Sequence, residues 1–316
     1  MKIHEIELSG ELLKIQGIGE EGTGMPFSSH QSSCSNRKPK NFEWTDEDAD
    51  IQVWMDMAIP SAINIPIPQG KKRYGWFCES RAIVPLLRQA FHQEDIFNDI
   101  INSYDAIFTC ETTLVEKHDK IHFCFAGSNL PWVDRYLPVG IEKPKLLSFI
   151  CSNKSMCAGH KIRHQLFEKI ESSTNRDVVV DVFGGITGKF FGVSPGCHIK
   201  GYKKRWHDKS EALNDYMFSI VMENDVYDTY FTEKLTDCFA TGTVPIYYGS
   251  RSIVNYFNPD GIIFIDGDVN TMYNKIQKIT PSMYHNRMDA IKDNMERVRN
   301  MQLADDMLYD KIKELE

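Results

Sequence analysis

The sequence predicts an α/β protein with largely parallel sheets, on three observations. Short apolar runs alternate along the chain with longer segments of helical periodicity. Residues 216–249 show this alternation completely, as an apolar run, a polar loop, an amphipathic helix and a second apolar run. A length of 316 residues favours two domains over one. We therefore expect a ligand site at the carboxyl ends of parallel strands.

Residues 1–144 are expected to form the first α/β domain. Its strands and helices are predicted at residues 1–15 (an edge strand), 51–57, 72–78, 82–93 (a helix) and 97–111 (a helix followed by a strand). The aperiodic stretch 17–40 predicts a long loop, either a lid or acceptor-site element or a disordered insertion. The proline-punctuated residues 131–144 are interpreted as the connection between domains.

Residues 145–316 are expected to form the second α/β domain. Its strands are predicted at residues 146–151, 178–183, 217–222, 244–248 and 262–265. Its helices are predicted at residues 158–172, 230–241, 269–279 and 282–301, with a last helix after residue 301 that packs back on the first domain. For the helix at 230–241, Asp228 or Thr229 is the expected cap and Gly242 the expected end.

Composition and charge argue against several classes of protein. A hydrophobic fraction of 42% and a charged fraction of 25% are typical of a globular chain. The net charge of −8 argues against a nucleic acid or an anionic membrane as the main partner. The eight cysteines contain no CxxC pair, so we expect reduced thiols and no zinc site. The first ten residues lack the apolar core of a signal peptide, and no apolar run reaches about 18 residues. We therefore expect a soluble, cytoplasmic chain without a membrane anchor.

Two charged residues begin the helix of the central unit. Glu233 and Lys234 lie off its apolar face, in the first turn. An ammonium beside the free N–H groups of a helix N-terminus suits a phosphate. The carboxylate next to it can accept hydrogen bonds from a ribose diol. The alternative is a solvated pair of surface charges.

The surrounding sequence carries a longer motif. Residues 218–259 contain FSIVMEN, YFTEK, TVPIYYG and FNP in this order. The motif resembles the nucleotide-sugar-binding motif of the family 10 glycosyltransferases, the α-1,3/1,4-fucosyltransferases, and the resemblance extends over about residues 145–265. It implies a GT-B-like fold, in which two Rossmann-like domains face a cleft. Residues 1–144 would then bind the acceptor and residues 145–316 the nucleotide sugar.

The resemblance also implies a set of donor-binding residues, with Glu233 and Asn224 on the ribose, Lys234 and Arg163 on the diphosphate, and Tyr230 in the nucleotide pocket. The full donor-binding set is Arg163, Glu223, Asn224, Tyr230, Thr232, Glu233 and Lys234. The role of Glu223 stays open between contacting the donor sugar and fixing the loop. Arg163 is chosen over Lys161 because it matches the arginine of the family's S-N…R segment, which Ser152 and Asn153 resemble, and because a guanidinium can hold two phosphate oxygens at once.

Glu79 is the candidate catalytic residue. Trp76 to Ser80 is similar to the family's W-x-x-E-S segment, which implies that the carboxylate of Glu79 is the general base. The family has a proline after this segment where this chain has Arg81. A purely structural glutamate at a strand end is the alternative.

The sequence thus predicts an inverting glycosyltransferase that moves L-fucose from GDP-fucose to a hydroxyl of a glycan acceptor. Two cations beside the leaving diphosphate stabilise its growing charge, so no cofactor or metal is required and a divalent ion would be at most stimulatory. The D-x-D spacings at residues 48–50 and 266–268 do not outweigh the longer motif. The alternatives are a GT-B transferase for another nucleotide sugar and a non-catalytic protein that binds glycans or nucleotides.

Overall fold

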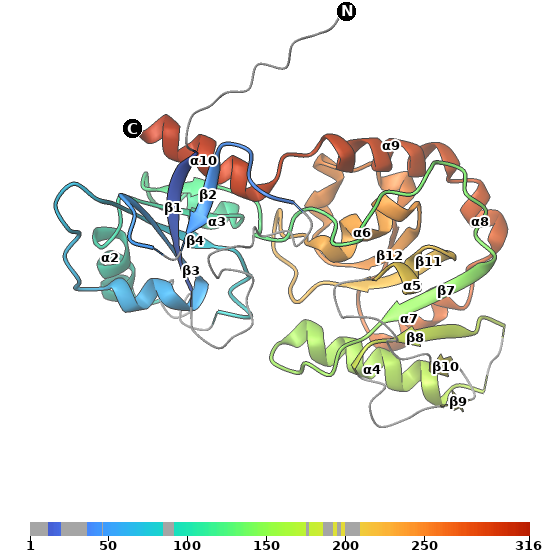
Figure 1. Ribbon diagram of the computed structural model, residues 1–316. Coiled ribbons are helices and arrows are strands. Elements are labelled where there is room, and N and C mark those ends of the chain that lie inside the picture. The colour runs from blue at the N-terminus through green and yellow to red at the C-terminus, as the bar shows by residue number, and fades with distance from the viewer. Residues whose placement is uncertain are drawn as a thin grey trace, which may run out of the picture.

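The computed structural model describes residues 12–19, 37–45, 47–84, 92–174, 177–185, 192–194, 197–199 and 209–316. These residues form two lobes, each built around a parallel sheet, so the predicted α/β class is confirmed (Figure 1). Most of the predicted loop at 17–40 and of the predicted helix at 82–93 lies outside the described residues. None of the described helices combines the length and the apolar character needed to cross a membrane.

The first sheet has the strand order β2-β1-β3-β4-β5-β6, and every adjacent pair is parallel. Its strands are β1 (Leu13–Ile18), β2 (Phe42–Thr45), β3 (Ile51–Met55), β4 (Lys72–Phe77), β5 (Ala106–Thr109) and β6 (Ile121–Phe123). The prediction that the first strand lies at an edge was wrong. β1 lies between β2 and β3, because β2, too short to show a period in the sequence, pairs along its outer side.

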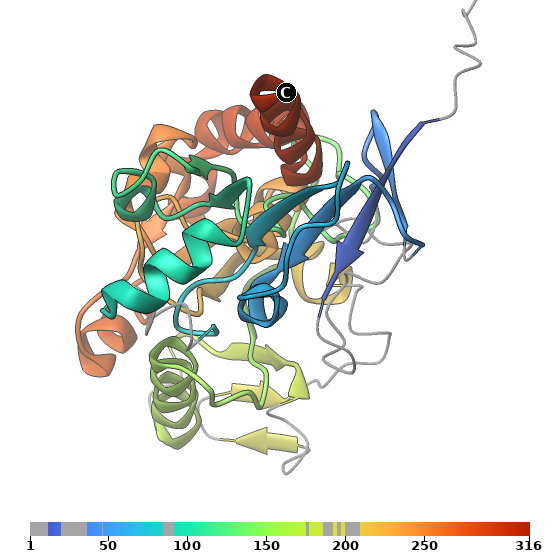
Figure 2. The ribbon, with the colours of Figure 1, turned by 90° about the vertical axis from the view of Figure 1, so that its left-hand side faces the viewer.

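Both faces of the first sheet are covered. On one face pack the 3₁₀ helix η1 (Asp56–Ala62) and the helices α2 (Glu94–Asn102) and α3 (Thr112–Val115). The last helix, α10 (Ala304–Leu315), lies across the other face, far from its neighbours in sequence (Figures 1 and 2). There Leu308 and Ile312 are fully buried, and the indole nitrogen of Trp44 donates a hydrogen bond of 2.7 Å to Asp305. The chain therefore returns to the first lobe at its end.

The second sheet has the order β13-β12-β11-β7-β8-β10-β9, parallel except for the pair β9 and β10. Its strands are β7 (Lys145–Ile150), β8 (Val180–Phe183), β9 (Gly192–Ser194), β10 (Cys197–Ile199), β11 (Tyr216–Met222), β12 (Val244–Tyr248) and β13 (Ile263–Phe264). The predicted boundary at residue 144 falls directly before β7. The strands β11 and β7 lie at the centre, so their carboxyl ends lie where a ligand binds in such sheets.

The helices of the second lobe are α4 (Ala158–Ser172), α5 (Ser210–Leu213), α6 (Glu233–Thr241), α7 (Val269–Ile276), α8 (Pro281–His285) and α9 (Met288–Asn300). The short 3₁₀ helices η3 (Arg251–Asn255) and η4 (Pro259–Gly261) follow β12. The single helix predicted at 282–301 is therefore two helices. Tyr284 of α8 packs on Phe218 of β11, and its hydroxyl donates to the carbonyl oxygen of Gly242 at the end of α6. α9 packs along α6. One straight helix could not make both sets of contacts.

α6 starts later than predicted. Thr232, and not Asp228 or Thr229, is the cap, and its hydroxyl accepts a hydrogen bond from the backbone N–H of Lys234. Thr229 has a left-handed φ of 63°, and its hydroxyl donates to the carbonyl oxygen of Cys110 in the other lobe. This contact between lobes holds residues 227–231 out of the helix. Gly242 ends α6 as predicted, with a left-handed φ of 67°.

Candidate active site

The two lobes touch at the carboxyl ends of β4 and β11. Glu79 follows β4, and Glu223 and Asn224 follow β11. The Oε2 of Glu79 accepts hydrogen bonds from the hydroxyl of Tyr230 at 3.0 Å and from the amide of Asn224 at 3.5 Å. The structure thus brings together residues that lie about 150 positions apart, as expected from the sequence for a site between domains.

Asp56 holds the backbone at Glu79 through hydrogen bonds. One oxygen of Asp56 accepts the N–H groups of Cys78 and Glu79, at 2.9 and 3.1 Å. Asp56 opens η1 with a left-handed φ of 42°, and its second oxygen is buried with no hydrogen-bond partner among the described residues. Burial, together with the nearby Glu79, raises the pKa of Asp56 to about 7. This residue was not predicted from the sequence, although it follows β3 as Glu79 follows β4.

Glu223 holds the turn that leads into α6. It is fully buried, and its two oxygens accept hydrogen bonds from the N–H and the hydroxyl of Thr232, at 2.9 and 2.8 Å. The ammonium of Lys234 lies 3.5 Å from the same carboxylate and donates to the Thr232 hydroxyl at 2.9 Å. Of the two roles left open for Glu223, this geometry supports fixing the loop. The Lys234 side chain keeps 26% of its surface exposed, so its charge remains accessible.

Glu233 belongs to a buried charge cluster that was not predicted from the sequence. The ammonium of Lys209 lies 2.8 Å from Oε1 of Glu233 and 2.8 Å from Oδ2 of Asp237. The other oxygen of Asp237 accepts the N–H groups of Trp132 and Val133, at 2.6 and 2.9 Å. Burial acts to raise the pKa of Glu233, but Lys209 and Lys234 outweigh it and lower the pKa to about 2. The alternative of a solvated Glu233–Lys234 pair is therefore wrong.

Arg163 lies on α4 and faces the carboxyl end of β7. Its side chain is buried, and Nη2 donates to the hydroxyl of Ser152 at 2.8 Å. Its Nε is buried and has no hydrogen-bond partner in the described part of the chain. Burial lowers the pKa of Arg163, and Glu223 is among the groups that oppose this shift. The competing Lys161 is exposed, so Arg163 is the cation that faces inward from α4.

The start of α4 packs directly on the turn after β11. A Cβ atom on Gly159 would lie 2.4 Å from the carbonyl oxygen of Asn224 and 2.5 Å from that of Glu223. The thiol of Cys157 donates to the same Asn224 carbonyl at 3.2 Å. His160 is buried beside Arg163, and its burial and this neighbour lower its pKa to about 4, so it is neutral at pH 7. Gly159 thus permits a backbone contact that positions Asn224.

Replacing Gly159 by alanine is expected to push α4 away from this turn. Neither carbonyl can move without disturbing Glu223 or Asn224, so we expect a loss of stability of about 1–3 kcal/mol. The midpoint of urea unfolding measures this loss. Alanine at Gly185, where a Cβ atom would meet its nearest neighbour at 3.5 Å, is the matched control and is expected to change the midpoint far less. Equal midpoints for the two variants would contradict the packing argument.

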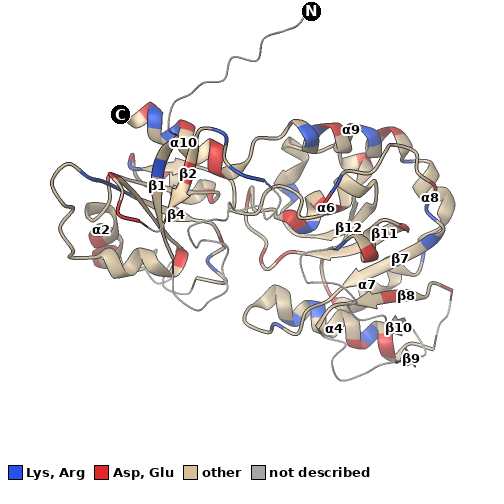
Figure 3. Cartoon of the chain, in the orientation of Figure 1, with Lys and Arg blue, Asp and Glu red and all other residues tan. Residues whose placement is uncertain are grey.

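Three aspartates of the two D-x-D segments, at residues 48–50 and 266–268, have structural roles. Asp48 forms an ion pair with Lys71, and Asp266 forms one with Arg251. Asp268 caps α7 by accepting the N–H groups of Asn270 and Thr271. Within the described ranges, no group of three or more His, Cys, Asp and Glu side chains is arranged to hold a metal ion. Along the ribbon drawn in Figure 3, segments with Lys or Arg and segments with Asp or Glu alternate in both lobes.

Comparison with known proteins agrees with the motif. Residues 141–284 match the model of glycosyltransferase family 10 (fucosyltransferase), C-terminal part. A stretch of 56 residues is 39% identical to the alpha-(1,3)-fucosyltransferase FucT of Helicobacter pylori, over 18% of this chain and 12% of that protein's length. The resemblance indicated by the motif is therefore confirmed, although the chain matches only a small part of that relative.

Two solved structures share the fold. An α1,3-fucosyltransferase gives a TM-score of 0.50 at 15% identity, over 94% of this chain and 84% of that one. A T4 phage BGT mutant in complex with UDP-glucose gives 0.51 at 10% identity, over 97% and 99%. The GT-B-like arrangement of two Rossmann-like lobes is therefore confirmed.

Proposed function

We propose that this chain, whose residues 141–284 match the model of glycosyltransferase family 10 (fucosyltransferase), is an inverting transferase that moves L-fucose from GDP-fucose to a hydroxyl of a glycan acceptor. In this proposal residues 1–144 bind the acceptor and residues 145–316 bind the donor. The observation that carries it is the contact of Glu79, from one lobe, with Tyr230 and Asn224 of the motif in the other. An acid thus faces the donor motif across the interface.

The donor site would use the ends of two helices and two cations. Lys234 lies in the first turn of α6, and Arg163 in the second turn of α4, so the diphosphate would meet an ammonium, a guanidinium and free backbone N–H groups. Asn224 and the ionised Glu233 would bind the ribose, and Tyr230 would line the pocket. Glu223 and Thr232 would contribute indirectly, because they hold Lys234 and the start of α6.

The reaction needs one proton transfer and one displacement. Glu79 would take the proton of the acceptor hydroxyl, whose oxygen attacks the anomeric carbon while GDP leaves. Burial and the neighbouring Glu79 raise the pKa of Tyr230 well above its usual range, so its hydroxyl keeps its proton and orients Glu79 as a donor. The charge that grows on the diphosphate would be stabilised by Arg163 and Lys234. No cofactor enters this scheme, and a divalent ion would be stimulatory only.

Replacing Lys234 by alanine is expected to weaken GDP binding about 10- to 100-fold, because a charge-assisted hydrogen bond to phosphate is lost. Isothermal titration calorimetry of both proteins with GDP measures this change. Lys161→Ala, which removes an exposed lysine from α4, is the matched control and should bind GDP as the unmodified chain does. Undiminished transfer by Lys234→Ala at subsaturating donor would remove the phosphate role of this residue.

The nucleotide and the turnover can be tested separately. A transferase for another nucleotide sugar is the second candidate, since one structural neighbour was solved with UDP-glucose. Calorimetric titration with GDP, UDP and ADP distinguishes the donors, and a clear preference for UDP would overturn the fucose assignment. A protein that only binds glycans or nucleotides would release no GDP from GDP-fucose, with or without an acceptor panel. GDP release that depends on Glu79 would exclude it.

A further inference from the structure

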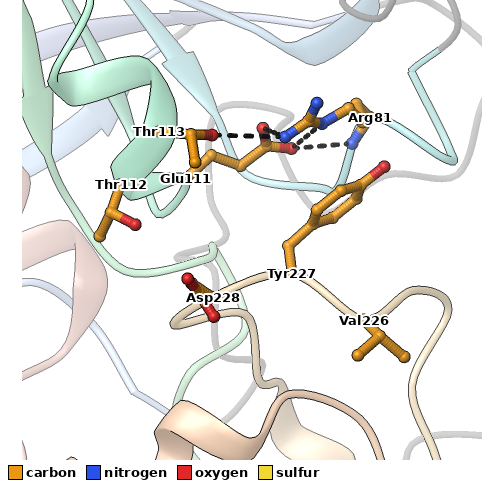
Figure 4. A pocket seen from close by; sticks show the side chains of 7 residues that line it. All are labelled: Arg81, Glu111, Thr112, Thr113, Val226, Tyr227 and Asp228. Carbon is orange, nitrogen blue, oxygen red and sulfur yellow. Dashed lines mark hydrogen bonds and ion pairs between the residues drawn. The ribbon is translucent and has the colours of Figure 1, made fainter.

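A second feature lies on the same interface as Glu79. A pocket of about 200 Å³ is lined by Arg81 and residues 111–113 of the first lobe and by residues 226–228 of the second (Figure 4). The segment after β4 faces the loop before α6 at two points. Glu79 contacts Tyr230 at one point, and Arg81 contacts Tyr227 at the other. The lining of the pocket therefore comes within two residues of Glu79 along the first lobe, at Arg81, and within two residues of Tyr230 along the second, at Asp228.

The charge of Arg81 is already neutralised inside this pocket. Its Nη2 lies 2.8 Å from one oxygen of Glu111, and its Nε donates to the other oxygen at 3.2 Å. The centre of the guanidinium lies 4.2 Å from the ring centroid of Tyr227, a cation–π distance. Arg81 therefore forms one side of the pocket and contacts both lobes, through Glu111 in the first and Tyr227 in the second. A planar group paired with a carboxylate and covering an aromatic ring has little charge left for an anionic ligand.

The remaining groups suit a hydroxyl-rich ligand. The hydroxyls of Thr112 and Thr113 line the pocket from the first lobe and the carboxylate of Asp228 lines it from the second (Figure 4). The Thr113 hydroxyl also accepts a hydrogen bond of 3.5 Å from Arg81. Asp228 is exposed, and no lysine or arginine of the described ranges forms an ion pair with it. With Arg81 and Glu111 cancelling each other, the pocket carries a net negative charge.

We propose that this pocket binds the acceptor as a neutral, hydroxyl-rich sugar and discriminates against sugars that carry a carboxylate. The inference rests on the proposed transferase function and adds the acceptor class to it. Hydroxyls of a neutral sugar can donate to Asp228 and exchange hydrogen bonds with Thr112 and Thr113, whereas a second carboxylate beside Asp228 is repelled. Arg81 in the pocket wall and Glu79 belong to the same segment after β4, so a sugar that extends from this pocket along the interface would bring a hydroxyl to Glu79, which would take its proton.

Saturation-transfer-difference NMR on the full chain with GDP tests the inference directly. The probes are the methyl glycosides of glucose, galactose, N-acetylglucosamine and glucuronic acid at pH 7. We expect saturation of at least one neutral glycoside and a dissociation constant at least about fivefold weaker for the glucuronide than for the glucoside, because like charges repel. Equal or tighter binding of the glucuronide, or no saturation of any neutral glycoside, would overturn the inference.

Two variants locate the binding in the pocket. Asp228→Asn is expected to reduce the preference for glucoside over glucuronide about fivefold, and Tyr227→Ala to weaken the neutral glycosides about tenfold. Asp289→Asn, which removes the same charge from α9 outside the pocket, is the control and should preserve the preference. An unchanged preference in Asp228→Asn would overturn the assignment to this pocket. Failure of the transferase proposal itself would appear separately, as absence of GDP binding and of GDP-fucose turnover in the unmodified chain.

Discussion

Replacing Glu79 by glutamine is expected to lower the turnover number for sugar transfer about 10³-fold while GDP binding stays unchanged. The amide keeps the size of the side chain and can still accept the hydrogen bond from Tyr230, but it cannot take a proton from the acceptor. General base catalysis contributes about 10²- to 10⁴-fold in enzymes, which sets the expected loss. The measurement is the turnover number with GDP-fucose and acceptor both saturating, beside a calorimetric titration with GDP.

The control separates a base from a structural glutamate at a strand end. Glu116→Gln removes an exposed carboxylate from the same lobe and should leave the turnover number within about twofold of the original, as expected for an exposed surface residue. The thermal midpoint of Glu79→Gln should also match that of the original chain. A variant that folds normally and transfers sugar at more than about a tenth of the original rate would show that the base is another residue.

Positions at strand ends were the part of the site that the sequence could predict. Glu79 and Asn224 follow apolar runs that are typical of strands, and the carboxyl ends of parallel strands meet at one edge of a sheet. Lys234 was singled out by its place in the first turn of a predicted helix, where an ammonium suits a phosphate, and then by the family motif. Tyr230 was assigned to the nucleotide pocket only through the family motif. The ends of β11 and α4 were predicted within one residue, since their apolar patterns are strong.

The supporting residues could not be predicted, because their roles depend on contacts that are distant in sequence. Lys209 lies 24 residues before Glu233, in a segment without a period, and charged residues are ordinarily exposed. Asp56 acts through the backbone of Cys78 and Glu79, which only the pairing of β3 with β4 brings near. The start of α6 depends on a hydrogen bond from Thr229 to the other lobe, which no local capping rule contains.

Replacing Lys209 by methionine is expected to cause the largest loss of stability. The variant leaves the carboxylates of Glu233 and Asp237 buried beside each other without the ammonium that neutralises both. Removing one partner of a buried ion pair costs about 3–5 kcal/mol, because the uncompensated charge stays out of water. Urea unfolding followed by circular dichroism measures the shift of the midpoint. Lys292→Met, which removes an exposed partner of Asp289, is the control. It should change the free energy of unfolding by no more than about 0.5 kcal/mol.

If Lys209→Met loses stability because two buried charges are left unpaired, neutralising Glu233 and Asp237 as well should restore that stability. The triple variant Lys209→Met, Glu233→Gln, Asp237→Asn keeps the shapes of the side chains, and the amide oxygen introduced at position 237 can still accept the N–H groups of Trp132 and Val133. Replacing a whole buried cluster by neutral groups is often close to neutral, so we expect recovery of most of the loss. A triple variant as unstable as Lys209→Met would mean that the stability comes instead from the contact of the Lys209 ammonium with the Trp132 ring, whose centroid lies 5.1 Å away. In either case the cluster lies where α6 meets the connection between the lobes, because Asp237 accepts the N–H groups of Trp132 and Val133.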